Sequence, residues 1–153
     1  EKITAVSEKT RDINEFVTDT LGVRAAEESA PAQNTVTWHD PCHLKKNLGI
    51  YKQPRTILAA AGGLRFIEMK EPDRCCGMGG SFNLEHYELS KKIGQKKLKD
   101  ISDTGADYVA TGCPACMLQI IDLLSHAGHN AEVKHAIELY AGALDKRSEK
   151  KSR

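Results

Sequence analysis

The feature that most constrains the fold is an alternation of strand-like and helix-like segments that begins near residue 35. Four short segments have the composition of strands: residues 35–40 (TVTWHD), 64–69 (LRFIEM), 107–112 (DYVATG) and 131–136 (AEVKHA). A segment with helical spacing of apolar residues follows each of them, the longest from about residue 83 to 104. This alternation predicts an α/β fold, a small parallel sheet of about four strands with helices packed on it as Rossmann-like βα repeats.

The two ends of the chain show different patterns. Ile13, Phe16 and Val17 lie at helical spacing and predict an N-terminal helix, which a polar connector follows up to residue 34. At the other end, DKRSEKKSR is a run of charged residues that predicts a disordered tail. We therefore divide the chain into an N-terminal helix and connector (1–34), a βα domain (35–144) and a charged tail (145–153).

Composition excludes several classes of protein. The chain is 40% hydrophobic and 28% charged with a net charge of +1, which is ordinary for a globular protein and gives no reason to expect nucleic-acid binding. Its apolar runs are too short to span a bilayer, and its polar first residues do not form a signal peptide. The absence of an initiator Met indicates either processing or a fragment, and we expect a fragment of a longer protein.

Five cysteines follow three of the predicted strands. Cys42 comes after the first strand, the adjacent pair Cys75 and Cys76 after the second, and Cys113 and Cys116 after the third. The carboxyl ends of parallel strands meet at one edge, where open α/β sheets bind ligands, so we expect the five thiols to converge. An odd number of cysteines in a chain of this size favours thiols that bind a metal or react over a closed disulfide framework.

The adjacent pair favours a centre with more than one metal. Neighbouring cysteines do not easily bridge each other, because the peptide between them is stiff and disulfide geometry is specific. Two such thiols can instead bind different irons of an iron–sulfur cluster, whereas structural zinc takes four ligands around one ion. A zinc site remains an alternative, as does a dithiol redox pair of Cys113 and Cys116, although that pair leaves three cysteines unexplained.

Residues beside the cysteines are expected to support the centre from a second layer. His39 and His43 flank Cys42 and would hydrogen-bond a cluster sulfur or the loop, with direct ligation as the alternative. The glycines would let the backbone approach closely and aim N–H groups at sulfur, and a proline would begin a helix whose N-terminus favours thiolate. These residues are Gly77, Gly79, Gly80 and Pro114.

Two groups of cations each have alternative roles. Lys45, Lys46 and Arg74 lie near the cysteines in sequence and either offset the charge of an iron–thiolate centre or are ordinary surface residues. Five lysines crowd the long helix predicted after the second strand, which indicates a solvated helix face, with a docking surface for an acidic partner as the alternative. They are Lys91, Lys92, Lys96, Lys97 and Lys99.

The order of cysteine motifs resembles the cysteine-rich CCG domain of the heterodisulfide reductase B-subunit family, from about Val36 to Ala141. The segments HDPCHLKK, PDRCCGMGGSF and TGCPACM are most similar to the C-terminal domain of the iron–sulfur subunits of glycolate oxidase and respiratory lactate dehydrogenases. The resemblance implies a non-cubane [4Fe-4S] cluster, with zinc as the alternative metal and an empty site as the risk of aerobic preparation. Its implied ligands are Cys42, Cys75, Cys76, Cys113 and Cys116.

The resemblance also implies a role in electron transfer. Electrons would pass from a flavin-bearing partner subunit toward a quinone in a lactate- or glycolate-type oxidoreductase, in the cytoplasm or peripherally on the inner face of the membrane. Family members usually carry a ferredoxin-like segment and a first CCG domain before this one, so the domain alone is not expected to oxidise a hydroxy acid. The alternatives are a disulfide-cleaving cluster domain of heterodisulfide reductase type and a zinc-bound structural or docking module.

Overall fold

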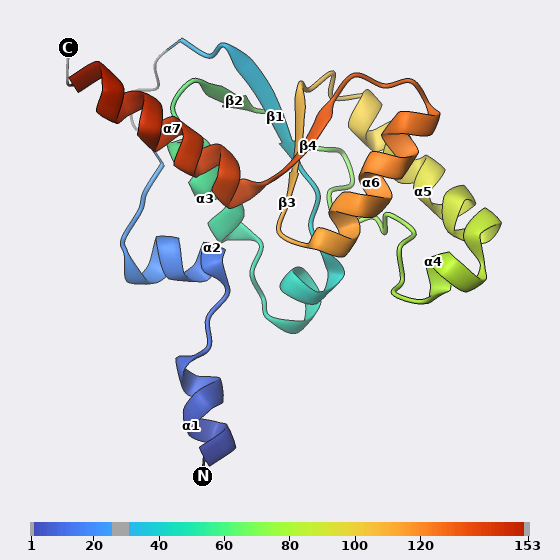
Figure 1. The fold of residues 1–153 in the computed structure, drawn as a ribbon, viewed down its shortest axis with the longest axis horizontal. Coiled ribbons are helices and arrows are strands. Elements are labelled where there is room, and N and C mark those ends of the chain that lie inside the picture. The colour runs from blue at the N-terminus through green and yellow to red at the C-terminus, as the bar shows by residue number, and fades with distance from the viewer. Residues whose placement is uncertain (1, 26–30, 152–153) are drawn as a thin grey trace.

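A four-stranded parallel sheet forms the centre of the computed structural model, which describes residues 2–25 and 31–151 (Figure 1). Its strand order is β2-β1-β3-β4, and β1 lies between its two partners, so that Val36 is in register with Phe66 on one side and Tyr108 on the other. The α/β fold with a small parallel sheet is therefore confirmed. The strands are β1 (Asn34–Trp38), β2 (Leu64–Phe66), β3 (Tyr108–Thr111) and β4 (Glu132–His135).

Helices cover both faces of this sheet. Helices α3 (Lys52–Ala60) and α7 (Ala136–Lys151) pack together on one face, and α5 (Tyr87–Ser102) and α6 (Pro114–His126) pack together on the other (Figure 1). The short α4 (Phe82–Glu85) precedes α5 and is separated from it by His86, whose backbone (φ −132°, ψ 49°) is not helical. The long helix predicted from residue 83 to 104 is thus two helices.

Each face has its own apolar core. On the α3/α7 face, Val36 and Trp38 of β1 pack with Leu58. On the α5/α6 face, Val109 of β3 packs with Ile101 of α5 and with apolar residues of α6. Side chains alternate between the faces along a strand, which explains why successive strand residues enter different cores.

The second strand is shorter than predicted. It ends at Phe66, although the amide of Ile67 still donates to the carbonyl of Val36 (2.8 Å), and Met69 then turns into the α5/α6 core. This strand lies at the edge of the sheet, so only β1 holds its backbone, and the chain is free to leave toward the adjacent pair Cys75 and Cys76.

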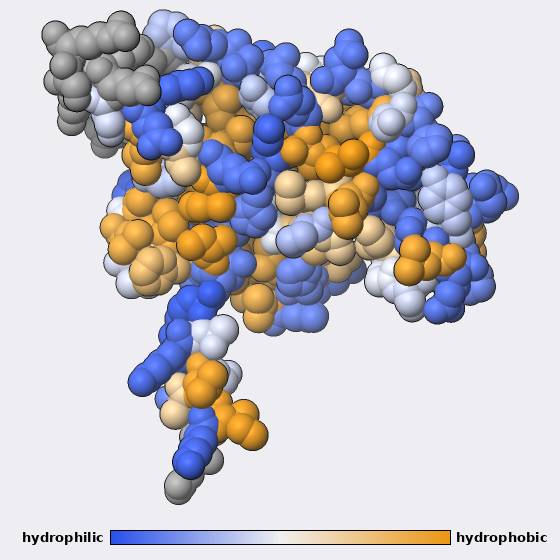
Figure 2. All heavy atoms as spheres, viewed as in Figure 1, coloured by the Kyte–Doolittle hydropathy of each residue, from blue (hydrophilic) through white to orange (hydrophobic). Residues whose placement is uncertain are grey.

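The N-terminal region contains more helix than the sequence indicates. Helix α1 (Lys2–Lys9) buries no residue and projects from the body, and α2 (Ile13–Glu15) continues into a π-helical turn, η1 (Phe16–Thr20) (Figure 1). Of the predicted apolar stripe only Val17 is buried. Figure 2 shows apolar side chains around this region, where Ile13 and Phe16 are partly exposed. The connector predicted after this helix falls partly on residues 26–30, which lie outside the described residues.

The charged tail continues a helix where the sequence predicts disorder. Helix α7 extends to Lys151, and residues 152–153 lie outside the described part of the chain. The composition of the tail is compatible with a helix, because Lys, Arg and Glu are good helix formers.

None of the helices in the described ranges is long and apolar enough to cross a membrane.

The lysines of α5 do not all lie on one solvated face. Lys92, Lys96 and Lys99 are exposed as predicted, but Lys97 has an exposed fraction of 0%. The buried positions of this helix include Gly94, Lys97 and Ile101, which recur at helical spacing, so Lys97 lies on the face that packs inward.

Candidate metal centre

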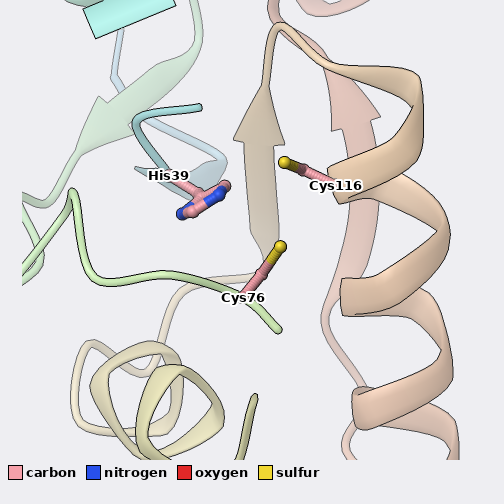
Figure 3. A group of neighbouring side chains, drawn as sticks. All are labelled: His39, Cys76 and Cys116. Atoms are coloured by element: carbon pink, nitrogen blue, oxygen red, sulfur yellow. The ribbon is translucent and has the colours of Figure 1, made fainter. Parts of the chain in front are cut away.

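The carboxyl ends of three strands bring together two of the five cysteines and a histidine. His39 follows β1 directly, Cys76 lies in the loop after β2, and Cys116 is in the first turn of α6, which follows β3. The sulfur atoms of the two cysteines and a ring nitrogen of His39 all lie within 4.8 Å of one another, and Figure 3 shows the three side chains facing a common space. The expected convergence at this edge therefore holds for side chains that are 77 positions apart in the sequence, from His39 to Cys116.

Neighbouring cysteines influence the pKa values of the thiols at this site. Hydrogen bonding with Cys116, together with burial, raises the pKa of Cys76 to about 12. Hydrogen bonding with Cys76, followed by burial, likewise raises the pKa of Cys75. An interaction with Cys42 lowers the pKa of Cys75 and partly offsets this rise. The pKa shifts thus relate the exposed Cys42 and Cys75 to the buried Cys76, and Cys76 to the half-buried Cys116.

Cys113 is placed differently from the other four. It is buried and occupies the position just before α6, where its backbone is extended (φ −130°, ψ 115°) and Pro114 begins the helix. Pro114 is therefore the first helical residue, whereas the effect of this helix N-terminus on the thiolates stays a prediction. The Cys113 sulfur is not part of the close group of His39, Cys76 and Cys116.

His39 is buried and neutral. Burial, followed by the positive charge of Lys97, lowers the pKa of this imidazole to about 3. Its Nδ1 atom has no hydrogen-bond partner among the described residues, although an unpartnered buried nitrogen is costly. His43, by contrast, is exposed in the π-helical turn η2 (His43–Asn47) that follows Cys42.

Gly77 explains why a glycine follows the cysteine pair. Its φ is 98°, and a Cβ atom there would lie 2.3 Å from the backbone oxygen of Ser90 on α5. Its amide donates to the sulfur of Cys75 (3.3 Å), which is the predicted use of an N–H group in this loop. Gly79 and Gly80 also have positive φ, of 55° and 66°, but a Cβ at Gly80 would meet open space.

Ion pairs fix the segments that carry the cysteines. Lys45, just after Cys42, pairs with Asp73, just before Cys75 (2.9 Å), which raises the pKa of the lysine and lowers that of the carboxylate. Arg74 pairs with Asp100 of α5 (2.7 Å) and with Glu71 (2.6 Å). Both cations therefore already have carboxylate partners, and their observed role is to join loops.

A buried carboxylate anchors the segment between β1 and Cys42. Asp40 accepts a hydrogen bond from the indole N–H of Trp38 (2.6 Å) and two from Arg55 of α3 (3.0 Å each). A bidentate arginine pair has fixed geometry, so it holds this stretch against the α3/α7 side of the sheet. His39 is thereby held with its ring toward the thiols on the other side.

A second set of hydrogen bonds joins the cysteine loop to α5 and α6. Ser90 donates to the carbonyl of Gly77 (2.8 Å), and the amide of Asn83 donates to Ser90 (2.9 Å) and to Gln119 (2.7 Å). Gln119 lies three residues after Cys116, so the network ties the loop that carries Cys76 to the helix that carries Cys116. These polar residues were not predicted from the sequence, because no motif marks them.

The donor set suits a thiophilic metal centre. Closely spaced thiols resist simultaneous ionisation because thiolates repel one another, and a bound cation removes that penalty. Thiolate sulfur and neutral imidazole are ligands for zinc and for iron–sulfur clusters. The unpartnered nitrogen of His39 beside Cys76 and Cys116 fits such a group, either as a ligand or as a donor to its sulfur.

Comparison with protein families agrees with this site. Residues 36–121 match the CCG family, described as a cysteine-rich domain, and this range contains all five cysteines together with His39. The chain therefore belongs to the CCG cysteine-rich domain family, as the order of its cysteine motifs predicts.

Curated relatives come from both branches of the resemblance. The chain is 34% identical to one of the subunits of dihydromethanophenazine:CoB–CoM heterodisulfide reductase from Methanosarcina barkeri over 135 residues, 86% of this chain and 33% of that protein. It is 45% identical to an uncharacterized iron–sulfur protein from Methanococcus maripaludis over 95 residues, 62% of this chain and 19% of that protein. Lactate utilization protein A from Oceanobacillus iheyensis is 29% identical over 134 residues, 88% of this chain and 54% of the relative. The chain thus spans between about a fifth and about half of these relatives.

Proposed function

We propose that this chain is an iron–sulfur electron-transfer domain of an oxidoreductase. The observation that carries the proposal is the convergence of Cys76, Cys116 and His39 at the carboxyl edge of the sheet, with Cys42 and Cys75 linked to them through neighbouring thiols. Relatives that are named as an iron–sulfur protein and as subunits of heterodisulfide reductase support it.

The five cysteines would hold a [4Fe-4S] cluster, of the non-cubane type that the family resemblance implies. A bound cluster would accept and release one electron at a time. The protein would supply the thiolates, limit the access of water to the inner side through the buried Cys76 and His39, and fix the loops through the ion pairs of Lys45 and Arg74. In this role His39, His43 and the loop glycines surround the cluster without binding its irons.

The wider reaction that we propose is oxidation of a hydroxy acid of the lactate or glycolate type. A flavin-bearing partner subunit would take two electrons from that substrate, and the cluster domain would pass them singly toward a quinone. The relative named for lactate utilization supports this branch. We further propose that the domain works in the cytoplasm or on the inner membrane surface, with a ferredoxin-like segment and a first CCG domain as its neighbours.

A second candidate is a cluster domain that takes part in reducing a disulfide. Cys42 and Cys75 are exposed while Cys76 is buried, so one side of the site is open to a substrate. The heterodisulfide reductase relative favours this role. A zinc-bound structural module is the third, since two cysteines and a histidine are also ligands that zinc takes.

The test is metal analysis and electron paramagnetic resonance of anaerobically purified protein supplied with iron and sulfide. We expect several irons per chain and a paramagnetic signal in one oxidation state. One zinc per chain without iron would contradict the proposal. A spectrum that changes when a disulfide substrate is added, without a flavin partner, would favour the second candidate.

Two variants connect the result to the site. Cys76→Ser should lose most of the bound iron, because this thiol lies at the buried centre of the group. His39→Ala should retain iron but change the spectrum if the imidazole only hydrogen-bonds sulfur, and lose iron if it is a ligand. His126→Ala, which removes an exposed histidine at the end of α6, is the matched control and should change neither.

A further inference from the structure

A buried lysine on the inward face of α5 contacts the segment that leads to Cys75 and Cys76. The ammonium group of Lys97 donates to the carbonyl oxygens of Glu71 (2.7 Å) and Pro72 (3.1 Å), and it lies 3.7 Å from the sulfur of Met69. These three residues form the segment that leads from β2 to Cys75 and Cys76. Lysine is almost never fully buried without a partner, so a site-specific reason is required.

The same two carbonyl groups tie further parts of the site together. The carbonyl of Pro72 also accepts from the amide of Asp40 (2.9 Å), two residues before Cys42, and the carbonyl of Glu71 accepts from the amide of Arg74 (3.2 Å). Lys97 therefore joins α5 to a point where the segments that precede Cys42 and Cys75 already meet.

The positive charge of Lys97 has no direct counter-ion. Among the described residues, no carboxylate lies within ion-pair distance of its ammonium, and the nearby Asp100 pairs with Arg74 instead. Burial lowers the pKa of Lys97 to about 8, so the group is still mostly protonated at neutral pH. An unpaired buried charge is costly, and an anionic group nearby would offset that cost.

Two residues of the thiol site lie within electrostatic range of this charge. Burial, followed by the charge of Lys97, lowers the pKa of His39. Burial also lowers the pKa of Lys97, and Asp100 and then Cys76 oppose that effect. The ammonium is thus electrostatically coupled to two of the three side chains that face one another at the buried end of the site.

We propose that Lys97 is a positioning residue for the metal centre: it clamps the Glu71–Pro72 segment that carries the cysteine pair, and its unpaired charge is the internal counter-charge of the metal-bound thiolates. The counter-charge role rests on the proposed iron–sulfur function, whereas the clamp on the Glu71–Pro72 segment does not. A fixed positive charge favours the more negative, reduced state of a cluster, so Lys97 would raise the reduction potential.

The test compares three variants of the 153-residue chain. Lys97→Met keeps most of the length of the side chain but removes both the donor and the charge. Lys97→Gln removes the charge and keeps an N–H donor, on a side chain that is one bond shorter and carries an added carbonyl oxygen. Lys96→Met removes the exposed lysine next to it and is the matched control. Circular dichroism first establishes that each variant is folded. If Lys97→Met fails to fold, the hydrogen-exchange and redox experiments below compare Lys97→Gln with Lys96→Met and the wild type.

Hydrogen exchange on the metal-free chain tests the clamp. The amides of Asp40 and Arg74 should exchange at least about tenfold faster in Lys97→Met, because hydrogen bonds to a charged donor are lost, and Lys97→Gln should lie between that variant and the wild type. Lys96→Met should match the wild type. Unchanged exchange at both amides in Lys97→Met and Lys97→Gln would overturn the clamp.

Redox titration of the iron-loaded chain, followed by electron paramagnetic resonance, tests the counter-charge. Both Lys97→Met and Lys97→Gln should shift the reduction potential to a more negative value, while Lys96→Met should leave it unchanged. A potential that is the same in Lys97→Gln as in the wild type would overturn this role. A wild-type chain that binds zinc and no iron would contradict the proposed function itself, whereas the exchange experiment would still decide the clamp.

Discussion

The two faces of the sheet are built from different kinds of residue. The α3/α7 face has a core of side chains such as Val36, Trp38 and Leu58. The α5/α6 face has an apolar core of its own, but it also encloses Lys97 and Gln119 and borders the buried Cys76. The first face combines this apolar core with one buried ion pair, between Asp40 and Arg55 of α3. The second places several buried polar groups beside the residues of the candidate metal centre.

The difference teaches where the constraints of function fall in this fold. Apolar burial on the α3/α7 face contributes stability that many sequences could supply. On the α5/α6 face, each buried polar group needs a specific partner, as when Ser90 bonds to Gly77 and Lys97 to Glu71. Changes on the second face should therefore affect both stability and the candidate metal centre, and changes in the apolar core of the first face should affect stability alone.

The largest effect is expected at Gly77. Gly77→Ala places a Cβ against the backbone of α5 and forces an L-residue to a positive φ, so it should lower the free energy of unfolding by about 4 kcal/mol and abolish metal binding. Urea unfolding and metal analysis measure the two effects. Gly80→Ala shares the positive φ but meets open space, and it should cost only about 1 kcal/mol. Equal costs for the two variants would show that the close approach to α5 is unimportant.

A smaller effect, confined to stability, is expected on the other face. Leu58→Ala removes a fully buried side chain from the α3/α7 core and should lower the free energy of unfolding by about 3 kcal/mol. The folded variant should bind as much metal as the wild type, measured by metal analysis below its unfolding midpoint. Leu118→Ala, at an exposed position, is the control for stability. Loss of metal in folded Leu58→Ala would break the distinction between the faces.

The smallest effect is expected at the amino ends of the strands, on the side of the sheet opposite the cysteines. Asp107 accepts hydrogen bonds from the amide and the hydroxyl of Thr35 (2.7 Å each), and these lower its pKa below the ordinary value of 3.8. The folded state thus binds fewer protons than the unfolded state, so this contribution is present above about pH 4 and is lost as pH falls through the folded pKa. Urea unfolding between about pH 3 and 7 should show a weaker acid dependence in Asp107→Asn. The reduction should be the same with and without metal, and a metal-dependent difference would couple this edge to the centre.

The general architecture could be predicted because strand and helix patterns are local. Residues such as Val36 and Val109 lie in β-branched segments with turn signals beside them, and alternation then implies a parallel sheet. Helix ends were less predictable. The π-helical turns η1 and η2 and the break at His86 depend on packing against the rest of the chain, and the length of β2 depends on its place at the edge.

The site could be predicted as a place but not in its detail. The cysteines follow strand ends, so their approach could be inferred from topology alone. The burial of Lys97 could not be predicted from topology, because Lys97 and the exposed Lys96 are the same type of residue. Only the helical spacing of Lys97 relative to Gly94 and Ile101 indicates that it is buried. Asn83 and Gln119 have no signal in the sequence, since their role depends on a hydrogen-bond network between separate helices.

The position of β1 in the sheet has a consequence for how the protein is assembled. This strand pairs with β2, about 30 residues later, and with β3, about 70 residues later, and the second contact closes a much longer loop. Cys42 and Cys76 can approach once the first pairing forms, but Cys116 reaches them only after β3 has joined the sheet. A nascent or truncated chain that ends before β3 would present three reactive thiols without the last two. Metal binding at the proposed centre would therefore depend on completion of the central sheet, and an incomplete chain would be the form most exposed to oxidation.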